Sequence, residues 1–314
     1  MLKAPVLLII FNRPETTKRV FEAIKSVRPS KLYIAADAPR EGNPDDYIRC
    51  KVARQLTEEI EWPCEVHRLY QDRNLGCSMG PRTAFQWFFS QEDEGIILED
   101  DCLPHEDFFA FAEEMLHRFR HEKRILSING SNLGYLVKSG ESYTFSRFMN
   151  MWGWATWADR AHSIDYSLSS WKKVKSPVWW LYRRLRQNIF DTDIYWYRYW
   201  QDKFDRTVNG KMITWWDWQW IFHQIEHRRL SVVPAQNLVT NIGFTQDATH
   251  TRAADNPAAE LPSSSLSRPY RHPRLIAGNI SYEENLKWVW CYHKRPSFMV
   301  SLKGCIKHIL KQAE

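Results

Sequence analysis

Three adjacent carboxylates give this 314-residue sequence its clearest chemical signal. In "GIILEDDC" (95–102), four residues suited to a buried strand run directly into Glu99, Asp100 and Asp101. Like charges repel one another, and burying them without a partner is costly. Carboxylate oxygens are also the ligands that hard divalent cations such as Mg²⁺ and Mn²⁺ prefer. The triplet therefore indicates either a cation site or a strand end that simply reaches the surface.

Strand geometry separates the roles of these acids. On a strand, neighbouring side chains point to opposite faces of the sheet. The three carboxylates then cannot share one role. We expect Asp101 to bind a metal ion, and Glu99 or Asp100 to face a hydroxyl or a basic group.

The elements around the triplet alternate between strand and helix over the first 130 residues. This order predicts an α/β fold, with a mostly parallel sheet flanked by helices on both faces. Ligands of such sheets bind outside the carboxyl ends of the strands, which is where Asp37 and the triplet fall. The predicted strands are 5–11, 31–37, 64–70, 95–102 and 124–130, and the helices between them include 46–61 and 79–90.

From about residue 140 the sequence becomes rich in aromatic residues. Most of the 16 tryptophans lie between Trp152 and Trp220. Tryptophan fills cores, stacks on sugars and lies at membrane interfaces, so all three interpretations stay open. The pattern predicts helices at 177–188, at 195–209 and after Asp217, and a basic amphipathic helix at 298–311.

Composition excludes several classes of protein. No apolar run approaches the roughly 20 residues that cross a bilayer, and the N-terminus lacks a signal-peptide pattern. Six scattered cysteines without a CxxC pair predict reduced thiols, and neither a disulfide framework nor a zinc site. A net charge of +6 is modest for this length and does not indicate nucleic-acid binding.

Four stretches in this order resemble a known family. They are "APVLLIIFNRPETTKRVFEAIKSVRPSKLYIAAD", "ILEDDCLPHEDFFAFAEEM", "FMNMWGWATW" and "WWDWQW". Together they are similar to GT-A-fold glycosyltransferases of the N-acetylglucosaminyltransferase I type, whose acidic motif reads EDD, and to bacterial relatives of that group. The resemblance covers residues 4–250. It implies a GT-A domain at 1–252, with a nucleotide-sugar half at 1–135 and an acceptor half at 136–252. Outside the resemblance, a stretch rich in proline, serine and alanine predicts a flexible linker at 253–270, which leaves a C-terminal extension at 271–314.

The resemblance also implies roles for single residues. Asp217 corresponds to the catalytic base, and Asp101 with a late histidine, His250, corresponds to the metal ligands for Mn²⁺ or Mg²⁺. Trp216 stands where the family pattern has a second acid, and residues 253–314 match nothing in the family. The implied donor contacts are Phe11, Arg13, Asp37, Arg82, Glu99 and Asp100, and the implied acceptor or sugar pocket is Trp152, Gly153, Trp154 and Trp216.

Such an enzyme moves a sugar from a nucleoside-diphosphate donor, here expected to be a UDP-sugar, with inversion. A divalent ion stabilises the charge on the departing diphosphate, and an aspartate accepts the proton of the acceptor hydroxyl. Burial among tryptophans would raise the pKa of Asp217 and make it a better base. The expected partner is a glycan or lipid-linked acceptor of surface-polysaccharide synthesis, in the cytoplasm at the inner face of the membrane. "WWLYRRLRQ" (179–187) and the tail suggest peripheral membrane contact.

Each of these residues also has a purely structural interpretation. Asp217 could be a helix N-cap, and Asp37 could cap a turn. Arg13 and His250 could be solvated loop residues, and Arg82 could pair with a surface acid. Two other functions stay open as well. One is a non-catalytic carbohydrate-binding protein, and the other is a metal phosphoesterase or nuclease, which would need a second His/Asp cluster that the sequence does not show.

Overall fold

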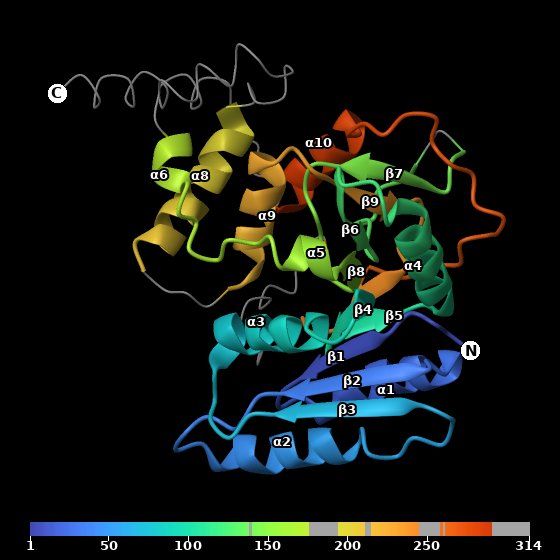
Figure 1. Ribbon diagram of the computed structural model, residues 1–314, viewed down its shortest axis with the longest axis vertical. Helices are drawn as coiled ribbons and strands as arrows, with labels where there is room; N and C mark the ends of the chain where they lie inside the picture. Colours follow the sequence, from blue (N-terminus) through green and yellow to red (C-terminus); the bar gives the residue numbers. More distant parts are fainter. Residues whose placement is uncertain (138–139, 176–193, 211–214, 245–257, 260, 291–314) are drawn as a thin grey trace.

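The computed structural model describes residues 1–137, 140–175, 194–210, 215–244, 258–259 and 261–290. Eight strands in these ranges form one sheet in the order β3-β2-β1-β4-β8-β6-β9-β7 (Figure 1). Its strands are β1 (Val6–Ile10), β2 (Lys31–Ala36), β3 (Glu65–Tyr70), β4 (Glu94–Glu99), β6 (Ile125–Asn129), β7 (Tyr143–Ser146), β8 (Trp154–Trp157) and β9 (Leu230–Pro234). A second sheet pairs β5 (Cys102–Pro104) with β10 (Val239–Asn241).

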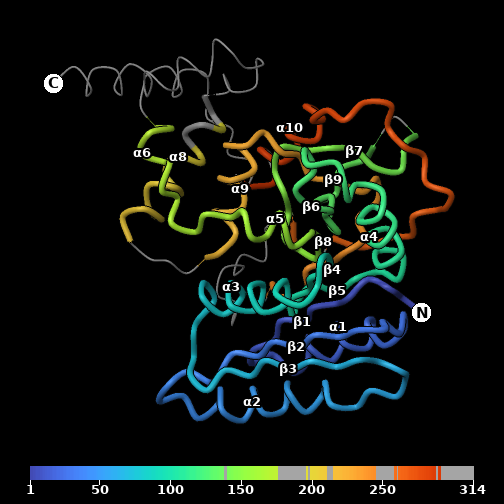
Figure 2. Tube along the Cα trace, viewed as in Figure 1, coloured from blue at the N-terminus to red at the C-terminus, as the bar shows by residue number. Residues whose placement is uncertain are grey.

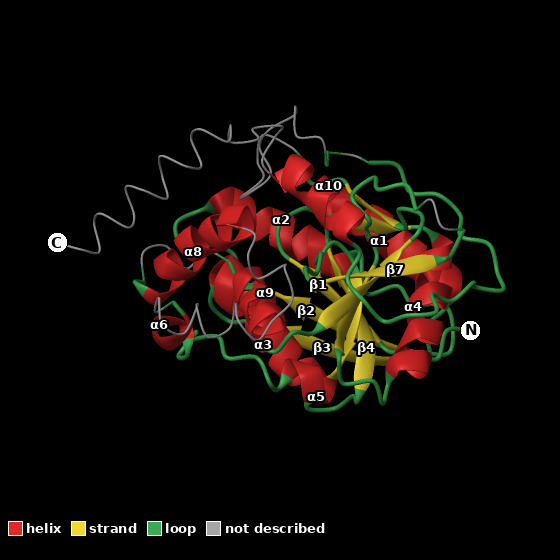
Figure 3. Cartoon of the chain, turned by 90° about the horizontal axis from the view of Figure 1, so that it is seen from above, coloured by secondary structure: helices red, strands yellow, loops and turns green. Residues whose placement is uncertain are grey.

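The strands β3, β2, β1 and β4 run parallel to one another, whereas β8 pairs antiparallel with both β4 and β6. The helices are α1 (Pro14–Val27), α2 (Pro44–Gln55), α3 (Gly76–Phe89), α4 (Glu106–Phe119), α5 (Ala158–Ala161), α6 (Trp171–Val174), α8 (Ile194–Val208), α9 (Asp217–Glu226) and α10 (Ile280–Trp290). Figure 3 shows the strands in the middle of the molecule with helices on either side. The predicted α/β fold class, a mostly parallel sheet flanked by helices, is confirmed.

Two hydrophobic cores cover the two faces of the sheet. In β1, Val6 and Leu8 face the core that includes α1 and α4, and Leu7 faces the core that includes α3 and α9. This division follows from the alternation of side chains along a strand. Both faces of the central strands are buried, which is why β1 and the middle of β4 read as continuous apolar runs, whereas β3 at the edge is partly exposed and more polar.

The chain order divides the molecule as Figure 2 shows, with the first strands and helices below and the later, aromatic half above. The predicted helices at 195–209 and after Asp217 are α8 and α9. Helix α2 ends at Gln55, earlier than the predicted residue 61. Acidic residues at 58, 59 and 61 would lie at the negative end of a longer helix, which disfavours its extension. The helices predicted at 177–188 and 298–311 lie outside the described residues.

The C-terminal part of the described chain packs on the domain. The Leu266 amide donates to Asp107 Oδ2 at 3.0 Å, and Leu266 and Tyr270 are buried in the core. Helix α10 lies against β7, where the Asn279 amide donates to the Phe145 carbonyl at 2.8 Å. These contacts cover parts of the ranges predicted as linker and extension. The predicted division at residues 252 and 270 stays a prediction.

No helix of the described residues combines the length and the apolar character that crossing a membrane requires.

Candidate functional site

The candidate site lies at the carboxyl edge of the parallel strands. Arg13 follows β1, Asp37 follows β2, and Glu99 is the last residue of β4. Because β8 runs antiparallel to β4, its first end, preceded by Gly153, meets the same edge. The Gly130 amide, after β6, donates to the Gly153 carbonyl at 2.7 Å and closes this side.

The acidic triplet leaves the sheet at a turn. Strand β4 ends at Glu99, and Asp100 and Asp101 form the turn before β5. Arg13 Nη1 lies 2.6 Å from Asp101 Oδ2 and 3.3 Å from Asp100 Oδ1. The expected alternation of side chains therefore does not extend beyond Glu99, whereas the separate roles expected of the three acids stay a prediction. Two neighbouring acids share one basic partner because the turn releases them from the alternation.

The charged groups of this cluster shift one another's pKa values. Burial, followed by the charges of Asp101 and Asp100, raises the pKa of Glu99 well above its ordinary value. Burial also raises the pKa of Asp100, against the opposing effect of Arg13. Burial opposes the charge of Arg13, but Asp100 and Asp101 together raise its pKa further above the ordinary value. The cluster therefore holds more negative charge than its one arginine balances.

A distant strand holds the turn in place. The Asp101 carbonyl accepts the Ile242 amide at 2.8 Å, just past the antiparallel pair of β5 and β10. A Cβ atom at Gly243 would lie 2.2 Å from Asp101 Oδ2. Glycine at this position is what allows the carboxylate to lie there. Gly243 could not be predicted from the sequence, because nothing local in "NIGF" indicates which segment the chain meets.

A cavity of about 420 Å³ opens beside the acids and brings several predicted residues together. Six of its lining residues were predicted from the sequence: Arg13, Glu99, Asp101, Trp152, Trp216 and Asp217. The others are Cys77, Pro81, Cys102, Met151, Trp215, Trp218 and Asn241. The lining thus combines acids with tryptophans of two separate segments.

Asp217 owes its position to the tryptophans beside it. Trp216, which is buried, packs between the rings of Phe85 (4.8 Å between ring centroids) and Trp154 (5.9 Å, nearly parallel). Ser78 Oγ donates to the Trp215 carbonyl at 3.0 Å and ties the same segment to α3. Asp217 is the first residue of α9, whose N-cap position is Trp216, so the expected alternative of Asp217 as N-cap does not describe this helix start.

Buried polar contacts fix the rest of α9. Trp220 is fully buried and its indole N–H donates to the Tyr166 hydroxyl at 3.1 Å. Gln224 Nε2 donates to Ser231 Oγ at 2.9 Å, and His223 Nε2 lies 3.2 Å from Ser163 Oγ. Burial, and then the charges of His227 and Arg229, lower the pKa of His223 to about 3. The helix that carries Asp217 therefore contains a neutral, buried histidine.

Four predicted donor contacts do not line the cavity: Asp100, whose pairing with Arg13 is described above, and Phe11, Asp37 and Arg82. The Phe11 amide donates to Asp100 Oδ2 at 3.2 Å, so this residue supports the acidic turn. The Asp37 carboxylate accepts the amides of Ala38, Leu75 and Gly76 at 2.8–3.2 Å, which is the turn-capping interpretation. Arg82 lies over the Tyr166 ring at 4.2 Å. Their contact with a nucleotide stays a prediction.

Two residues of the predicted aromatic loop serve the core. Trp154, at the start of β8, is fully buried, packs against Trp216 and Trp220, and lines neither this cavity nor the second one described below. Gly153 has a φ of +61°, and a Cβ there would lie 2.7 Å from Val239 Cγ2. Both positions are required by packing beneath the site. His250, the second predicted metal ligand, lies outside the described residues.

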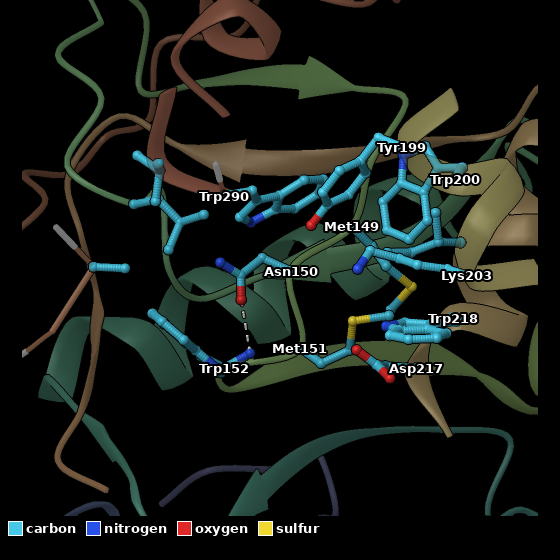
Figure 4. A pocket seen from close by; sticks show the side chains of 14 residues that line it. Met149, Asn150, Met151, Trp152, Tyr199, Trp200, Lys203, Asp217, Trp218 and Trp290 are labelled. Atoms are coloured by element: carbon cyan, nitrogen blue, oxygen red, sulfur yellow. Dashed lines mark hydrogen bonds between the residues drawn. The ribbon is translucent and has the colours of Figure 1, made fainter. Parts of the chain in front are cut away.

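A second cavity, of about 250 Å³, adjoins the first and was not predicted (Figure 4). The two share Met151, Trp152, Asp217 and Trp218. The other lining residues of the second are Leu133, Met149, Asn150, Tyr199, Trp200, Lys203, Ile221, Ala258, Val289 and Trp290. They come from segments far apart in the sequence, and the amphipathic pattern of α8 was the one local signal. Asp217 thus lies between an acidic cavity and an aromatic one.

Comparison with known proteins leaves the family open. No protein-family model matches the chain, and no curated protein matches it. Solved structures with some likeness include HddC from Yersinia pseudotuberculosis (10% identity, TM-score 0.30, covering 50% of this chain and 77% of that one). Another is a UDP-glucose pyrophosphorylase complexed with UDP-glucose (12% identity, TM-score 0.26, covering 46% of this chain and 63% of that one). Likenesses this low carry no information about what the chain binds or which reaction it catalyses.

Proposed function

We propose that this protein is a glycosyltransferase that moves a sugar from a nucleoside-diphosphate donor, a UDP-sugar, to a hydroxyl of a glycan or lipid-linked acceptor. One observation carries the proposal. Glu99, Asp101, Asp217 and Arg13 line a single cavity at the carboxyl edge of the parallel strands, walled by tryptophans. That edge is where α/β sheets bind their ligands. The resemblance of the acidic and tryptophan motifs to GT-A enzymes supports the same assignment.

The transfer needs a base for the acceptor hydroxyl and a positive charge that stabilises the departing diphosphate. The acceptor oxygen attacks the anomeric carbon and its proton passes to the Asp217 carboxylate, while the bond from that carbon to the diphosphate oxygen breaks. Attack from the face opposite the diphosphate inverts the anomeric centre. Asp217 suits this role because it lies at the wall shared by the two cavities. Arg13 brings a fixed positive charge to the cavity that would take the diphosphate.

The donor set fits a divalent cation in charge and in chemistry. Three carboxylates face the cavity against one guanidinium, and oxygen is the ligand that Mn²⁺ and Mg²⁺ prefer. Asp101 and Glu99 would hold the ion, with water and phosphate oxygens as further ligands. No group of three metal-binding side chains occurs among the residues that the structure describes, and His250 lies outside them. When bound, the ion would stabilise the charge of the departing diphosphate.

Calorimetry and donor hydrolysis test the proposal. UDP is expected to bind the full-length protein in the presence of Mn²⁺, and EDTA is expected to abolish transfer. Asp217→Asn should lower transfer by about 10²–10⁴-fold and still bind UDP. The matched control is Asp45→Asn, an exposed acid on α2. Unchanged transfer in Asp217→Asn would remove the base from the mechanism, and full activity in EDTA would remove the metal.

Calorimetry also distinguishes the transferase from the alternative function, a non-catalytic carbohydrate-binding protein. The aromatic walls of both cavities favour sugar contact by themselves. Glycan binding without any UDP binding, with or without Mn²⁺, would favour that alternative over the transferase. The segments expected to contact a membrane, 179–187 and 298–311, lie outside the described residues, and this contact stays a prediction.

A further inference from the structure

The second cavity draws one wall from the part of the chain that the family resemblance does not cover. Trp290 ends α10, beyond residue 252, and its ring stacks on Tyr199 of α8 with centroids 6.1 Å apart and planes 13° apart. Figure 4 shows these two rings along one side of the cavity and Trp152 with Trp218 along the other. The cavity is therefore built jointly by the aromatic half and by α10.

Helix α10 is anchored firmly enough to position Trp290. Glu283 is 1% exposed and forms an ion pair with Arg147, which follows β7. The Arg147 amide donates to the same carboxylate at 2.9 Å. Tyr282 and Leu286, on the same helix, are also fully buried. A charge this deeply buried is tolerated only with such partners. The ion pair therefore fixes the position of α10 on the domain.

The polar groups of the cavity are few and held in place. Lys203 Nζ lies 4.4 Å from the Tyr199 ring centroid and 4.6 Å from that of Trp218, which are cation–π distances. Asn150 Oδ1 accepts the Trp152 amide at 2.9 Å. In Figure 4 the ends of Lys203 and Asn150 point into the space between the two aromatic sides. Asp217 completes the set at the boundary with the acidic cavity.

We propose that this second cavity binds one sugar unit of the acceptor, with Trp290 as its stacking platform and Lys203 as a hydrogen-bond donor to its oxygens. The assignment of that sugar as acceptor rests on the proposed transferase function. A pyranose ring has an apolar face that stacks on indole and an edge of hydroxyls that needs donors and acceptors. The cavity offers both. A purely apolar ligand would offer Lys203 and Asn150 no polar contact.

The size and position of the cavity set the class of ligand more narrowly. Its volume of about 250 Å³ lies just below the roughly 300–1,000 Å³ of sites for drug-sized ligands, which suits a single monosaccharide unit. Because Asp217 lines both cavities, a hydroxyl of a sugar held here faces the base and the acidic cavity beyond it. The residues of α8 and α10 thus determine acceptor specificity, and those of the acidic cavity determine donor binding.

Direct binding of simple sugars tests this assignment and does not require the natural acceptor. Methyl glycosides of glucose, galactose and N-acetylglucosamine are added at millimolar concentration to the full-length protein, and saturation-transfer NMR detects binding. At least one is expected to bind. Trp290→Ala and Lys203→Met should each weaken that binding about tenfold, and Trp290→Phe should restore most of what the alanine variant loses. The matched control is Lys123→Met, an exposed lysine paired with Asp159.

The outcomes separate this inference from the proposed function. Binding of UDP with Mn²⁺ but of none of the glycosides overturns the sugar site and leaves the transferase standing. The sugar site is also overturned if a glycoside binds equally strongly to Trp290→Ala, Lys203→Met and the control Lys123→Met. Glycoside binding that depends on Trp290, in a protein that does not bind UDP, supports the site and refutes the transferase.

Kinetics provide a second measurement once transfer is observed. Lys203→Met keeps the aliphatic stem and removes the ammonium, so folding is less affected than in Trp290→Ala. The acceptor KM should rise about tenfold in this variant, and the donor KM should stay at the wild-type value. A rise in the donor KM with an unchanged acceptor KM would show that Lys203 contacts the donor, and would overturn its assignment to the acceptor site.

Discussion

The buried histidine of α9 predicts a pH dependence of stability that can be calculated. Burial lowers the pKa of His223 from 6.5 to about 3, so the folded state binds this proton far less readily than the unfolded state does. The stability that His223 contributes is fully present above pH 6.5 and is lost as the pH falls toward 3. Between pH 7 and pH 5 the free energy of unfolding should fall by about 2 kcal/mol from this residue alone.

Urea unfolding at the two pH values measures the effect as a difference between proteins. His223→Gln keeps a polar side chain beside Ser163 and cannot be protonated. Its loss of stability between pH 7 and pH 5 should be smaller than that of the wild type by about 2 kcal/mol. The matched control, His121→Gln, removes an exposed imidazole and should keep the wild-type change. Equal losses in His223→Gln and the wild type would refute the reasoning.

Two further substitutions test the packing and the charges beneath the site. Arg13→Met leaves Asp100 and Asp101 without their cation and should cost about 3 kcal/mol in urea unfolding, against at most about 1 kcal/mol for Arg206→Met at an exposed ion pair with Asp202. Similar losses in the two variants would contradict the importance of the buried cluster. Gly153→Ala should cost about 3 kcal/mol from backbone strain together with the clash against Val239, whereas Gly42→Ala, with a similar φ of +73° and open space, should lose only the strain of about 1–2 kcal/mol. Thermal or urea unfolding measures the loss of stability in the two glycine variants. Equal losses would show that the clash with Val239 in Gly153→Ala does not reduce the free energy of unfolding.

The sequence allowed prediction of the elements whose signals are local. The first strands are continuous apolar runs, and Glu99 and Asp37 stand at their ends, so the parallel sheet and its acidic edge could be expected. The partner of the acids could not be identified. Arg13 follows a strand that is adjacent to β4 in the sheet but almost ninety residues away in sequence, and which arginine meets Asp101 depends on that pairing.

The aromatic residues show more clearly which positions could not be predicted from the sequence. "MWGWATW" predicts a tryptophan-rich wall, yet Trp152 lines both cavities and Trp154, two residues later, lies in the core. The intervening Gly153, with its positive φ, ends the loop where β8 begins, and the two residues before it, Met151 and Trp152, stay at the site. Trp290 could not be assigned at all, because its neighbours Tyr199 and Trp200 belong to a helix about ninety positions earlier.

The pairing of β5 with β10 has a consequence for synthesis of the chain. Pro104 and Val239 are partners although 135 positions separate them in the sequence. Closing so long a loop is entropically slow, so this ladder should form late in folding. A chain still on the ribosome therefore exposes its acidic turn without the segment that shields it. The finished acidic pocket comes into being only after residues 239–243, in the last third of the polypeptide, have emerged.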